Sequence, residues 1–286
     1  MNEQYLNLLD EINAVSDELP DGSSDAPSRT RIIAVLKEIM VVLLPEYYTF
    51  HGMSQAEALY AVREDLIDEA AHAFALQESV REDGDAAEEN APLNADTLRQ
   101  KAEDAIIAFL QALPDTKRLI LTDIQAIYDG DPAAKSKAEV VLCYPGFFAI
   151  SIYRVAHVLY KLGVPLIPRI MTEYAHEKTG VDIHPGATIG EYFCIDHGTG
   201  VVVGETSTIG QHVKLYQGVT IGAKSFEKGP DGHPVKGGKR HPDIGNHVVI
   251  YANATILGGK TRIGDGAVIG GNAWITFSVG EGERVG

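Results

Sequence analysis

The sequence has few cysteines, no long apolar run and no excess of positive charge, and each absence excludes a class of protein. Only two cysteines occur among 286 residues, too few for the disulfide framework of a small secreted protein. Apolar runs such as Ile39–Leu44 are far shorter than the roughly 20 residues that cross a bilayer. The first residues contain neither the basic nor the apolar region of an export signal. We therefore expect a cytoplasmic protein without a membrane partner.

Negative charge is concentrated in the first half of the chain. Residues 1–140 contain 11 Lys+Arg and 28 Asp+Glu, whereas residues 141–286 contain 13 and 12. An acidic half repels phosphate backbones and anionic lipids, so nucleic acid is not expected as a partner. The segment 81–94 is the most acidic and lacks apolar periodicity, which predicts a surface linker.

The first half has the apolar spacing of α-helices. A capping box, Ser54 with Glu57, marks one helix start. We expect a helical domain over residues 1–177, with helices around residues 8–15, 31–44, from Ser54 onward, 96–112, 114–128, 145–162 and 165–176.

After residue 180 the apolar period changes to six. Aliphatic residues recur at 183, 189, 195 and 201; after a slip of two residues they resume at 203, 209, 215 and 221. The same step returns from Ile244 to Ile256 and from Ile263 to Ile275. Neither a helix nor a flat strand has this period, but a β-helix does, in which three six-residue units form one triangular coil. We expect residues 178–286 to form a left-handed parallel β-helix of stacked hexapeptide repeats.

One segment, residues 223–243, interrupts the repeat. It is rich in Gly and Pro and cannot form a coil, so we expect a projecting loop. The loop is basic within an acidic protein, and long loops in compact domains are commonly functional.

The pair Asp196-His197 stands where the repeat favours small residues. A carboxylate that orients one imidazole nitrogen leaves the other free as a general base, and Asp182, 15 residues earlier, is a candidate for that carboxylate. In the loop, Arg240 offers a planar fork for a carboxylate or a phosphate, beside His241. These residue types favour an enzyme that deprotonates a hydroxyl of a small acidic or zwitterionic substrate.

Several motifs together resemble the serine O-acetyltransferase family of hexapeptide-repeat acyltransferases. They are VDIHPGATIG, DHGTGVVVGET, the loop end GGKRHP, and upstream DGDPAA with YPGFFAISIYRVAH. The resemblance covers about residues 123–277 and, over the N-terminal extension, loosely the longer form of the family. It implies transfer of acetyl from acetyl-CoA to the hydroxyl of L-serine in L-cysteine biosynthesis, by direct attack and without a metal.

The resemblance also implies roles for individual residues. His197 is the general base, and Asp182 orients it. Asp131 and Asp196 lie against the ammonium and hydroxyl end of serine, while Arg240 binds the serine carboxylate with help from His241. Acetyl-CoA is expected to contact a further set of small or basic residues, namely Ala223, Ala252, Gly271 and Lys239.

Partners follow from the same resemblance. It implies a homotrimer or a dimer of trimers, with active sites between adjacent prisms, and L-cysteine as a feedback inhibitor. It implies O-acetylserine sulfhydrylase as a partner through a tail that ends in isoleucine, whereas this sequence ends at Gly286 without such a tail.

Three alternatives remain at this point. An acetyltransferase for a sugar or antibiotic hydroxyl would share the base but leave Arg240, Asp131 and Asp196 unexplained. A zinc enzyme would need ligands from neighbouring coils, for which the sequence offers only scattered histidines: His184, His197, His212, His241 and His247. A non-catalytic scaffold of the cysteine pathway is the third.

Overall fold

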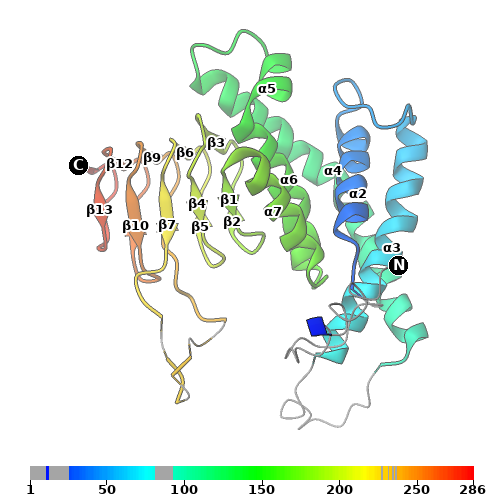
Figure 1. Ribbon diagram of the computed structural model, residues 1–286. Helices are drawn as coiled ribbons and strands as arrows, with labels where there is room; N and C mark the ends of the chain where they lie inside the picture. The colour runs from blue at the N-terminus through cyan, green and yellow to red at the C-terminus, as the bar shows by residue number, and fades with distance from the viewer. Residues whose placement is uncertain are drawn as a thin grey trace.

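The computed structural model describes residues 11–12, 26–80 and 93–286, apart from residues 227, 231, 234 and 236. Helices occupy one end of an elongated molecule, and a row of stacked strand coils forms the other (Figure 1). Most of the helix expected near residues 8–15 and most of the linker expected at 81–94 lie outside the described residues.

The helical half consists of helices that the sequence largely predicted. Its described helices are α2 (Arg29–Leu43), α3 (Gln55–Ser79), α4 (Ala95–Gly130), α5 (Lys137–Cys143), α6 (Pro145–Lys161) and α7 (Ile167–Thr179). The capping box at the start of α3 is confirmed, because Ser54 Oγ accepts from the Glu57 amide at 3.3 Å and the Glu57 carboxylate accepts from the Ser54 amide at 2.8 Å.

One expectation about helices was wrong, and one short helix was not predicted. The helices expected at 96–112 and 114–128 are one continuous helix, α4, with Pro114 inside it. Proline removes one backbone donor and strains the preceding turn, but packing along the whole buried stripe of α4 outweighs that cost. The short helix α5, capped by Ser136, was not predicted at all, because seven residues are too few to show a period.

The second half is a three-sided prism of parallel strands. Sheet A contains β1 (Asp182–Ile183), β4 (Val202–Val203), β7 (Thr220–Gly222), β10 (Thr255–Leu257) and β13 (Trp274–Ile275). Sheet B contains β2 (Thr188–Ile189), β5 (Thr208–Ile209), β8 (Asp243–Ile244) and β11 (Arg262–Ile263). Sheet C contains β3 (Cys194–Ile195), β6 (Lys214–Leu215), β9 (Val249–Ile250), β12 (Val268–Ile269) and β14 (Arg284–Val285).

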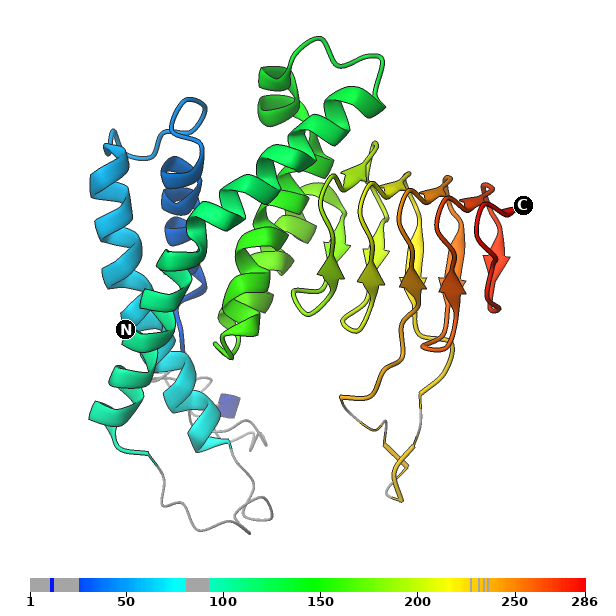
Figure 2. The same ribbon diagram turned by 180° about the vertical axis from the view of Figure 1, so that it is seen from behind.

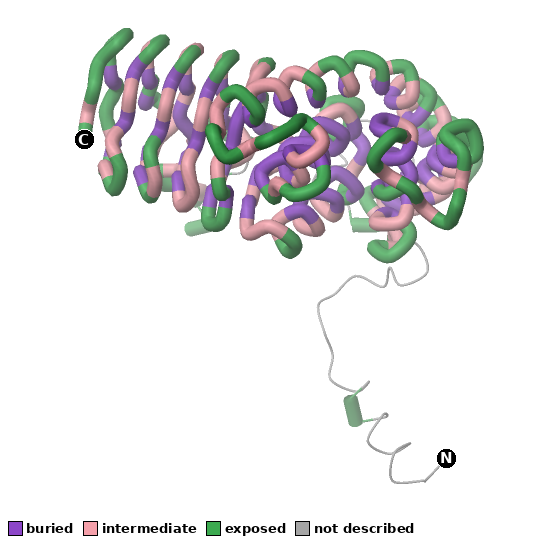
Figure 3. Tube along the Cα trace, turned by 90° about the horizontal axis from the view of Figure 1, so that it is seen from above, coloured by how far each residue is buried: buried purple, intermediate pink, exposed green. Residues whose placement is uncertain are grey.

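The hexapeptide period sets which side chains fill the prism. Apart from Val201, which precedes β4, each periodic aliphatic residue is the second residue of a strand. All of them are buried, and Ile195, Leu215 and Ile250 are fully enclosed. Figure 3 shows the same pattern, with buried positions on the strands and exposed positions at the corners. The fold is the expected left-handed parallel β-helix, and residues between β7 and β8 project from it as a loop (Figure 1).

Helix α6 covers the open end of the prism. The first coil has no preceding coil to satisfy its backbone carbonyls, so side chains of α6 donate to them. Tyr153 Oη donates to the carbonyl of Ala187 at 2.5 Å, and Arg154 donates to those of Ile189 and Gly190, both at 2.6 Å. Buried apolar residues of the helices and of the coils also form one continuous core.

The N-terminus of α6 and the C-terminus of α4 both meet sheet C at the first coil. A Cβ on Gly146 would lie 2.3 Å from the carbonyl oxygen of Ile195, so only glycine allows α6 to approach β3 this closely. Figure 2 shows α4 running obliquely across the helical half and ending beside the first coil. These two helix ends bring Asp131 and Tyr144 to the same place.

Among the described residues, no single helix has the length and apolar composition of a membrane span. The bent pair α5 and α6 meets that test only when the two are joined, and they meet at 79°.

Candidate active site

The prism corner between sheets C and A is wider in the first coil than elsewhere. From the start of a strand in sheet C to the next start in sheet A there are eight residues in the first coil (194 to 202), but six in the second (214 to 220). The two extra residues are the slip in the hexapeptide period. They belong to residues 196–200, which we call the widened corner.

His197 occupies a left-handed backbone position in the widened corner. Its φ is 58°, and Gly198 and Gly200 follow at 94° and 83°. This turn directs the imidazole outward, leaving 73% of the side chain exposed. An exposed imidazole at this corner can reach a hydroxyl that lies against the prism.

Asp196 is mostly enclosed and lies between two cationic or ionisable side chains. One carboxylate oxygen is 2.9 Å from Lys214 Nζ, and the other is 3.9 Å from His197 Nε2. The second distance is too long for a hydrogen bond.

Asp131 joins this group from the C-terminal end of α4. Its carboxylate accepts from Tyr144 Oη at 2.6 Å and from the Ala133 amide at 2.8 Å. The Tyr144 hydroxyl, then the Ala133 amide and the positive charges of Lys214 and His197, lower the pKa of Asp131 below its ordinary value. The same hydrogen bond raises the pKa of Tyr144 to about 12, so the phenol remains a donor.

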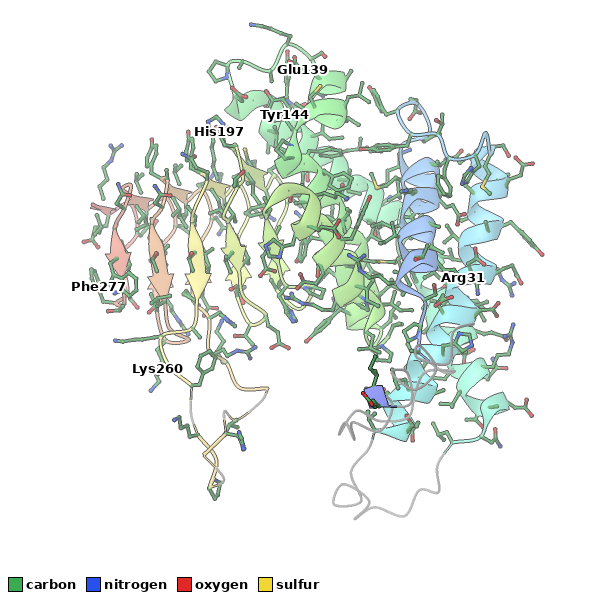
Figure 4. The ribbon with its side chains drawn as sticks, in the orientation of Figure 1. Arg31, Glu139, Tyr144, His197, Lys260 and Phe277 are labelled. Atoms are coloured by element: carbon green, nitrogen blue, oxygen red, sulfur yellow. The ribbon has the colours of Figure 1, made fainter. Side chains whose placement is uncertain are left out.

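The structure thus brings together Asp131, Asp196 and His197, which belong to two elements far apart in sequence. Figure 4 shows His197 and Tyr144 as neighbours at the edge of the prism where α5 and α6 meet it. Two carboxylates beside one imidazole form a site for an ammonium group and an adjacent hydroxyl.

Asp182 has a different partner in this structure. Its carboxylate is 3.5 Å from a guanidinium nitrogen of Arg169, on α7. Arg169 also pairs with Glu173, one turn further along that helix. Asp182 lies in sheet A next to the widened corner, but its recorded ion pair is with Arg169 rather than with His197.

Arg240 and His241 lie at a second corner, between sheets A and B, which we call the loop corner (residues 204–207 and 240–242). Thr206 links the two strand ends there, because its amide donates to His241 Nδ1 at 3.0 Å and its hydroxyl accepts from the Arg240 amide at 3.0 Å. Arg240 pairs with Glu205, whose carboxylate also accepts from Tyr160.

His241 is held neutral at the loop corner. Burial, with the Arg240 charge adding to it, lowers the pKa of His241 to about 4. The ring lies directly on Gly204, where a Cβ would be 2.1 Å from Nε2, so glycine is required at that position. A neutral imidazole can accept or donate a hydrogen bond without a charge.

The residues expected to contact acetyl-CoA also divide between the two corners. Ala252 and Gly271 follow β9 and β12, in the same column of corners as His197, and a Cβ on Gly271 would lie 3.2 Å from the Ala252 carbonyl. Ala223 begins the projecting loop, and Lys239 lies near its end, where its ammonium contacts Thr206 O at 2.6 Å. In Figure 4 His197 and Lys260, a residue of the loop-corner column, lie at opposite edges of the prism.

Sequence reasoning missed two residues of the site, Lys214 and Tyr144. Lys214 pairs in register with Cys194, which lies two residues before Asp196. Because the two partners are 20 positions apart, a coil length of 20 residues would have placed Lys214 near Asp196. Tyr144 begins the motif YPGFFAISIYRVAH, but its contact with Asp131 depends on how α4 and α6 pack.

The five histidines considered as zinc ligands lie at three different corners of the prism. His197 is at the widened corner, and His184 and His241 are on the loop-corner side. His212 and His247 stack on each other at 4.7 Å at the third corner, between sheets B and C. Within the described residues, the one set of metal-ligating side chains that comes together is Glu173, His176 and Asp182, and the Arg169 guanidinium already contacts both carboxylates.

Comparison with protein families gives a model match. Residues 86–151 match the family described as "Serine acetyltransferase, N-terminal". The chain is 54% identical over 188 residues to a plasmid-encoded serine acetyltransferase of Synechococcus elongatus, covering 66% of this chain. The match spans 59% of that relative's length.

Solved structures give the same result over more of the chain. Serine acetyltransferase 1 of Entamoeba histolytica, solved in complex with L-cysteine, is similar with a TM-score of 0.74 and 34% identity, covering 88% of this chain and 86% of that one. A serine acetyltransferase solved in complex with CoA has a TM-score of 0.54 and 28% identity, covering 87% and 94%.

Proposed function

Because this chain belongs to the serine acetyltransferase family, we propose that it transfers the acetyl group of acetyl-CoA to the hydroxyl of L-serine. The products are O-acetyl-L-serine and CoA, and the reaction belongs to L-cysteine biosynthesis. The observation that carries the proposal is the group at the widened corner, in which an exposed imidazole stands beside two carboxylates.

In the proposed reaction, His197 removes the proton of the serine hydroxyl as its oxygen attacks the thioester carbonyl. A bond forms between the serine oxygen and the acetyl carbon, the carbon–sulfur bond breaks, and the CoA sulfur takes up a proton. Asp131 and Asp196 hold the serine ammonium. No residue is acylated, and no metal is needed, because an acid–base pair and positioning suffice for acyl transfer.

We propose that Asp182 supports His197 only after a rearrangement. A carboxylate must lie within hydrogen-bond distance of an imidazole nitrogen to fix its tautomer, and Asp182 is paired with Arg169 in this structure. Apo sites often tighten on substrate binding, so release of Asp182 from Arg169 would accompany closure.

Arg240 and His241 are proposed to bind the serine carboxylate across a subunit boundary. Sheet A separates the loop corner from the widened corner of the same prism, which supports a site formed by two chains. We therefore propose a homotrimer, or a dimer of trimers, in which the loop corner of one prism faces the widened corner of the next.

Acetyl-CoA is proposed to run along this boundary. Small residues at Ala252 and Gly271 let the pantetheine approach the backbone in the column that begins at His197, and Ala223 and Lys239 would approach from the loop corner of the neighbouring prism. The relative solved with CoA supports CoA as the co-substrate.

Further features follow from the family. We propose L-cysteine as a feedback inhibitor at the serine site, supported by the Entamoeba relative solved with L-cysteine. We also propose O-acetylserine sulfhydrylase as a partner, a cytoplasmic location, and a division into a helical domain at 1–177 and a β-helix domain at 178–286.

The test follows loss of the thioester absorbance of acetyl-CoA with and without L-serine. Wild-type protein is expected to consume acetyl-CoA only with serine, and L-cysteine is expected to inhibit. His197→Asn should lower kcat by about 10²–10⁴-fold, because a positioned base contributes that much.

Asparagine suits this position because it tolerates the left-handed backbone of His197. His212→Asn is the matched control, since His212 is exposed, has a φ of 56° and lies at another corner. No consumption of acetyl-CoA with serine, from protein shown to be folded, would refute the proposal and favour another hydroxyl acceptor. Full activity in folded His197→Asn would refute the role of His197 as the base.

A further inference from the structure

Lys214 is a lysine on the outer face of a β-helix strand that does not extend into solvent. It is the first residue of β6, and its side chain is only 17% exposed. Aliphatic stems of lysine commonly lie along apolar surface while the ammonium reaches water. Here the ammonium is instead turned into the protein, toward the proposed acceptor site.

The Lys214 ammonium connects the two elements that carry the site's carboxylates. It lies 2.9 Å from Asp196 Oδ2, and it donates to the carbonyl oxygen of Gly130 at 2.8 Å. Gly130 ends α4 and immediately precedes Asp131. Helix α4 has no basic residue in its last turn, so Lys214 supplies the positive charge that its C-terminal carbonyls favour.

The aromatic ring of Tyr216 closes the remaining side of Lys214. The ammonium lies 4.5 Å from the centre of that ring, and Tyr216 stacks in turn on Tyr251 in the next coil. Burial alone would lower the pKa of Lys214, but Tyr216 and Asp196 outweigh it and raise the pKa above its ordinary value. The side chain is therefore a fixed positive charge throughout the range in which an imidazole titrates.

We propose that Lys214 is a positioning residue of the acceptor site, which ties Asp196 to the end of α4 and sets the net charge that His197 experiences. The inference rests on the proposed function. With both carboxylates ionised, Lys214 reduces their net charge from −2 to −1, and one negative charge then faces the single ammonium of serine.

The titratable and charged groups around His197 and its two neighbouring carboxylates come from four elements. Asp196 belongs to its own corner, and Asp131 comes from the end of α4. Lys214 comes from β6, and Tyr144, with Glu139 of α5 nearby, contacts Asp131. Cys194 lies beside Lys214 but is buried, and burial raises its pKa to about 12, so it carries no charge. Lys214 is thus the one fixed positive charge in this set.

The test compares Lys214→Met with wild type across pH. Methionine keeps the stem's packing but removes the charge, so the uncompensated carboxylates hold the proton on His197 more strongly. The acid limb of the pH profile of kcat/KM for serine should move to higher pH by about one unit. At pH values below the limb kcat/KM should fall about tenfold, and at pH values above it kcat/KM should equal that of wild type. A purely structural role would instead lower kcat/KM equally at every pH.

Three matched variants separate charge from packing. Lys214→Arg keeps the charge and should keep the limb near its wild-type pH, and Lys161→Met, an exposed lysine at the end of α6, should change nothing. The double variant Lys214→Met/Asp196→Asn removes one positive and one negative charge, so the net charge beside His197 is again −1. The acid limb of its pH profile should therefore return toward the wild-type pH. An unmoved limb in folded Lys214→Met would overturn the proposal.

A second readout does not depend on turnover. The titration of the His197 imidazole can be followed by NMR of histidine-labelled protein, with the resonance identified by its loss in His197→Asn. Its midpoint should rise in Lys214→Met. If wild type fails to acetylate serine but the midpoint rises, the proposed function is wrong and the role of Lys214 stands; an unmoved midpoint rejects that role in either case.

Discussion

Replacement of Arg154 by methionine is expected to destabilise the protein by removing contacts between the helical half and the first coil. Arg154 is 4% exposed and forms a two-point ion pair with Asp123, which is fully buried, through Nε and one Nη, both at 2.9 Å. It also donates to the carbonyls of Ile189 and Gly190, at the edge of the prism that no coil covers. Methionine preserves the stem's packing but removes every one of these donors.

The expected cost is dominated by the carboxylate left behind. Breaking a buried ion pair by removing one partner typically costs about 3–5 kcal/mol, because an uncompensated charge stays in the interior. Each unsatisfied carbonyl adds about 1–3 kcal/mol unless water reaches it. We therefore expect Arg154→Met to lower the free energy of unfolding by about 3–5 kcal/mol, with water at the exposed edge limiting the carbonyl contribution.

Urea unfolding followed by circular dichroism at one protein concentration measures this loss. The double variant Asp123→Asn/Arg154→Met removes the lone charge while keeping an acceptor for the Phe193 amide, which donates to Asp123 at 2.9 Å. It should recover at least half of the loss. Arg118→Met, an arginine of α4 with 69% side-chain exposure, should change stability by less than about 0.5 kcal/mol. A single variant within about 1 kcal/mol of wild type, or a double variant no more stable than the single, would refute the reasoning.

Two further predictions concern the loop corner. The unfolded chain protonates His241 near its ordinary pKa of about 6.5, whereas the folded protein protonates it only near a pKa of about 4, so stability should be complete above pH 7 and fall between pH 6.5 and 4. His241→Gln should remove up to about 3 kcal/mol of that fall, measured as the difference between urea midpoints at pH 7.5 and 4.5; an equal fall in both proteins would contradict it. Coexpressed Arg240→Ala and His197→Asn chains should recover activity at low serine that neither has alone, because mixed oligomers contain some boundaries with both native residues. No recovery, from oligomers shown to be mixed, would place the whole site within one chain.

The repeat half of the fold was predictable because its physics is local. Each coil buries one aliphatic residue per face, so the period of six appears directly in residues such as Ile209, Leu215 and Ile221. The two-residue slip before Val203 was visible as well, and it marks the widened corner that carries His197. The helical half was harder, because α4 continues through Pro114 on the strength of packing that no local pattern reports.

The candidate site was predictable only residue by residue. Asp196 and His197 stood out as ionisable residues in a pattern of small ones, and residue chemistry also pointed to Asp182, Arg240 and His241. Asp131 came from the family resemblance alone. Their grouping did not follow from spacing. Asp182 stands 15 residues before His197, yet its ion pair is with Arg169 of α7, a helix whose approach to β1 only the folded chain defines.

By itself, the sequence determined the period of the coils, the place of the projecting loop and the chemical types of the candidate residues, because these depend on neighbours along the chain. Tertiary structure decided which of those residues meet. It joins Asp196 through Lys214 to Gly130, the residue before Asp131, and it separates both carboxylates from Arg240 by the width of sheet A. The reason is physical: contacts between α4, α6 and the prism form between residues that are tens of positions apart, so no local pattern in the sequence reports them.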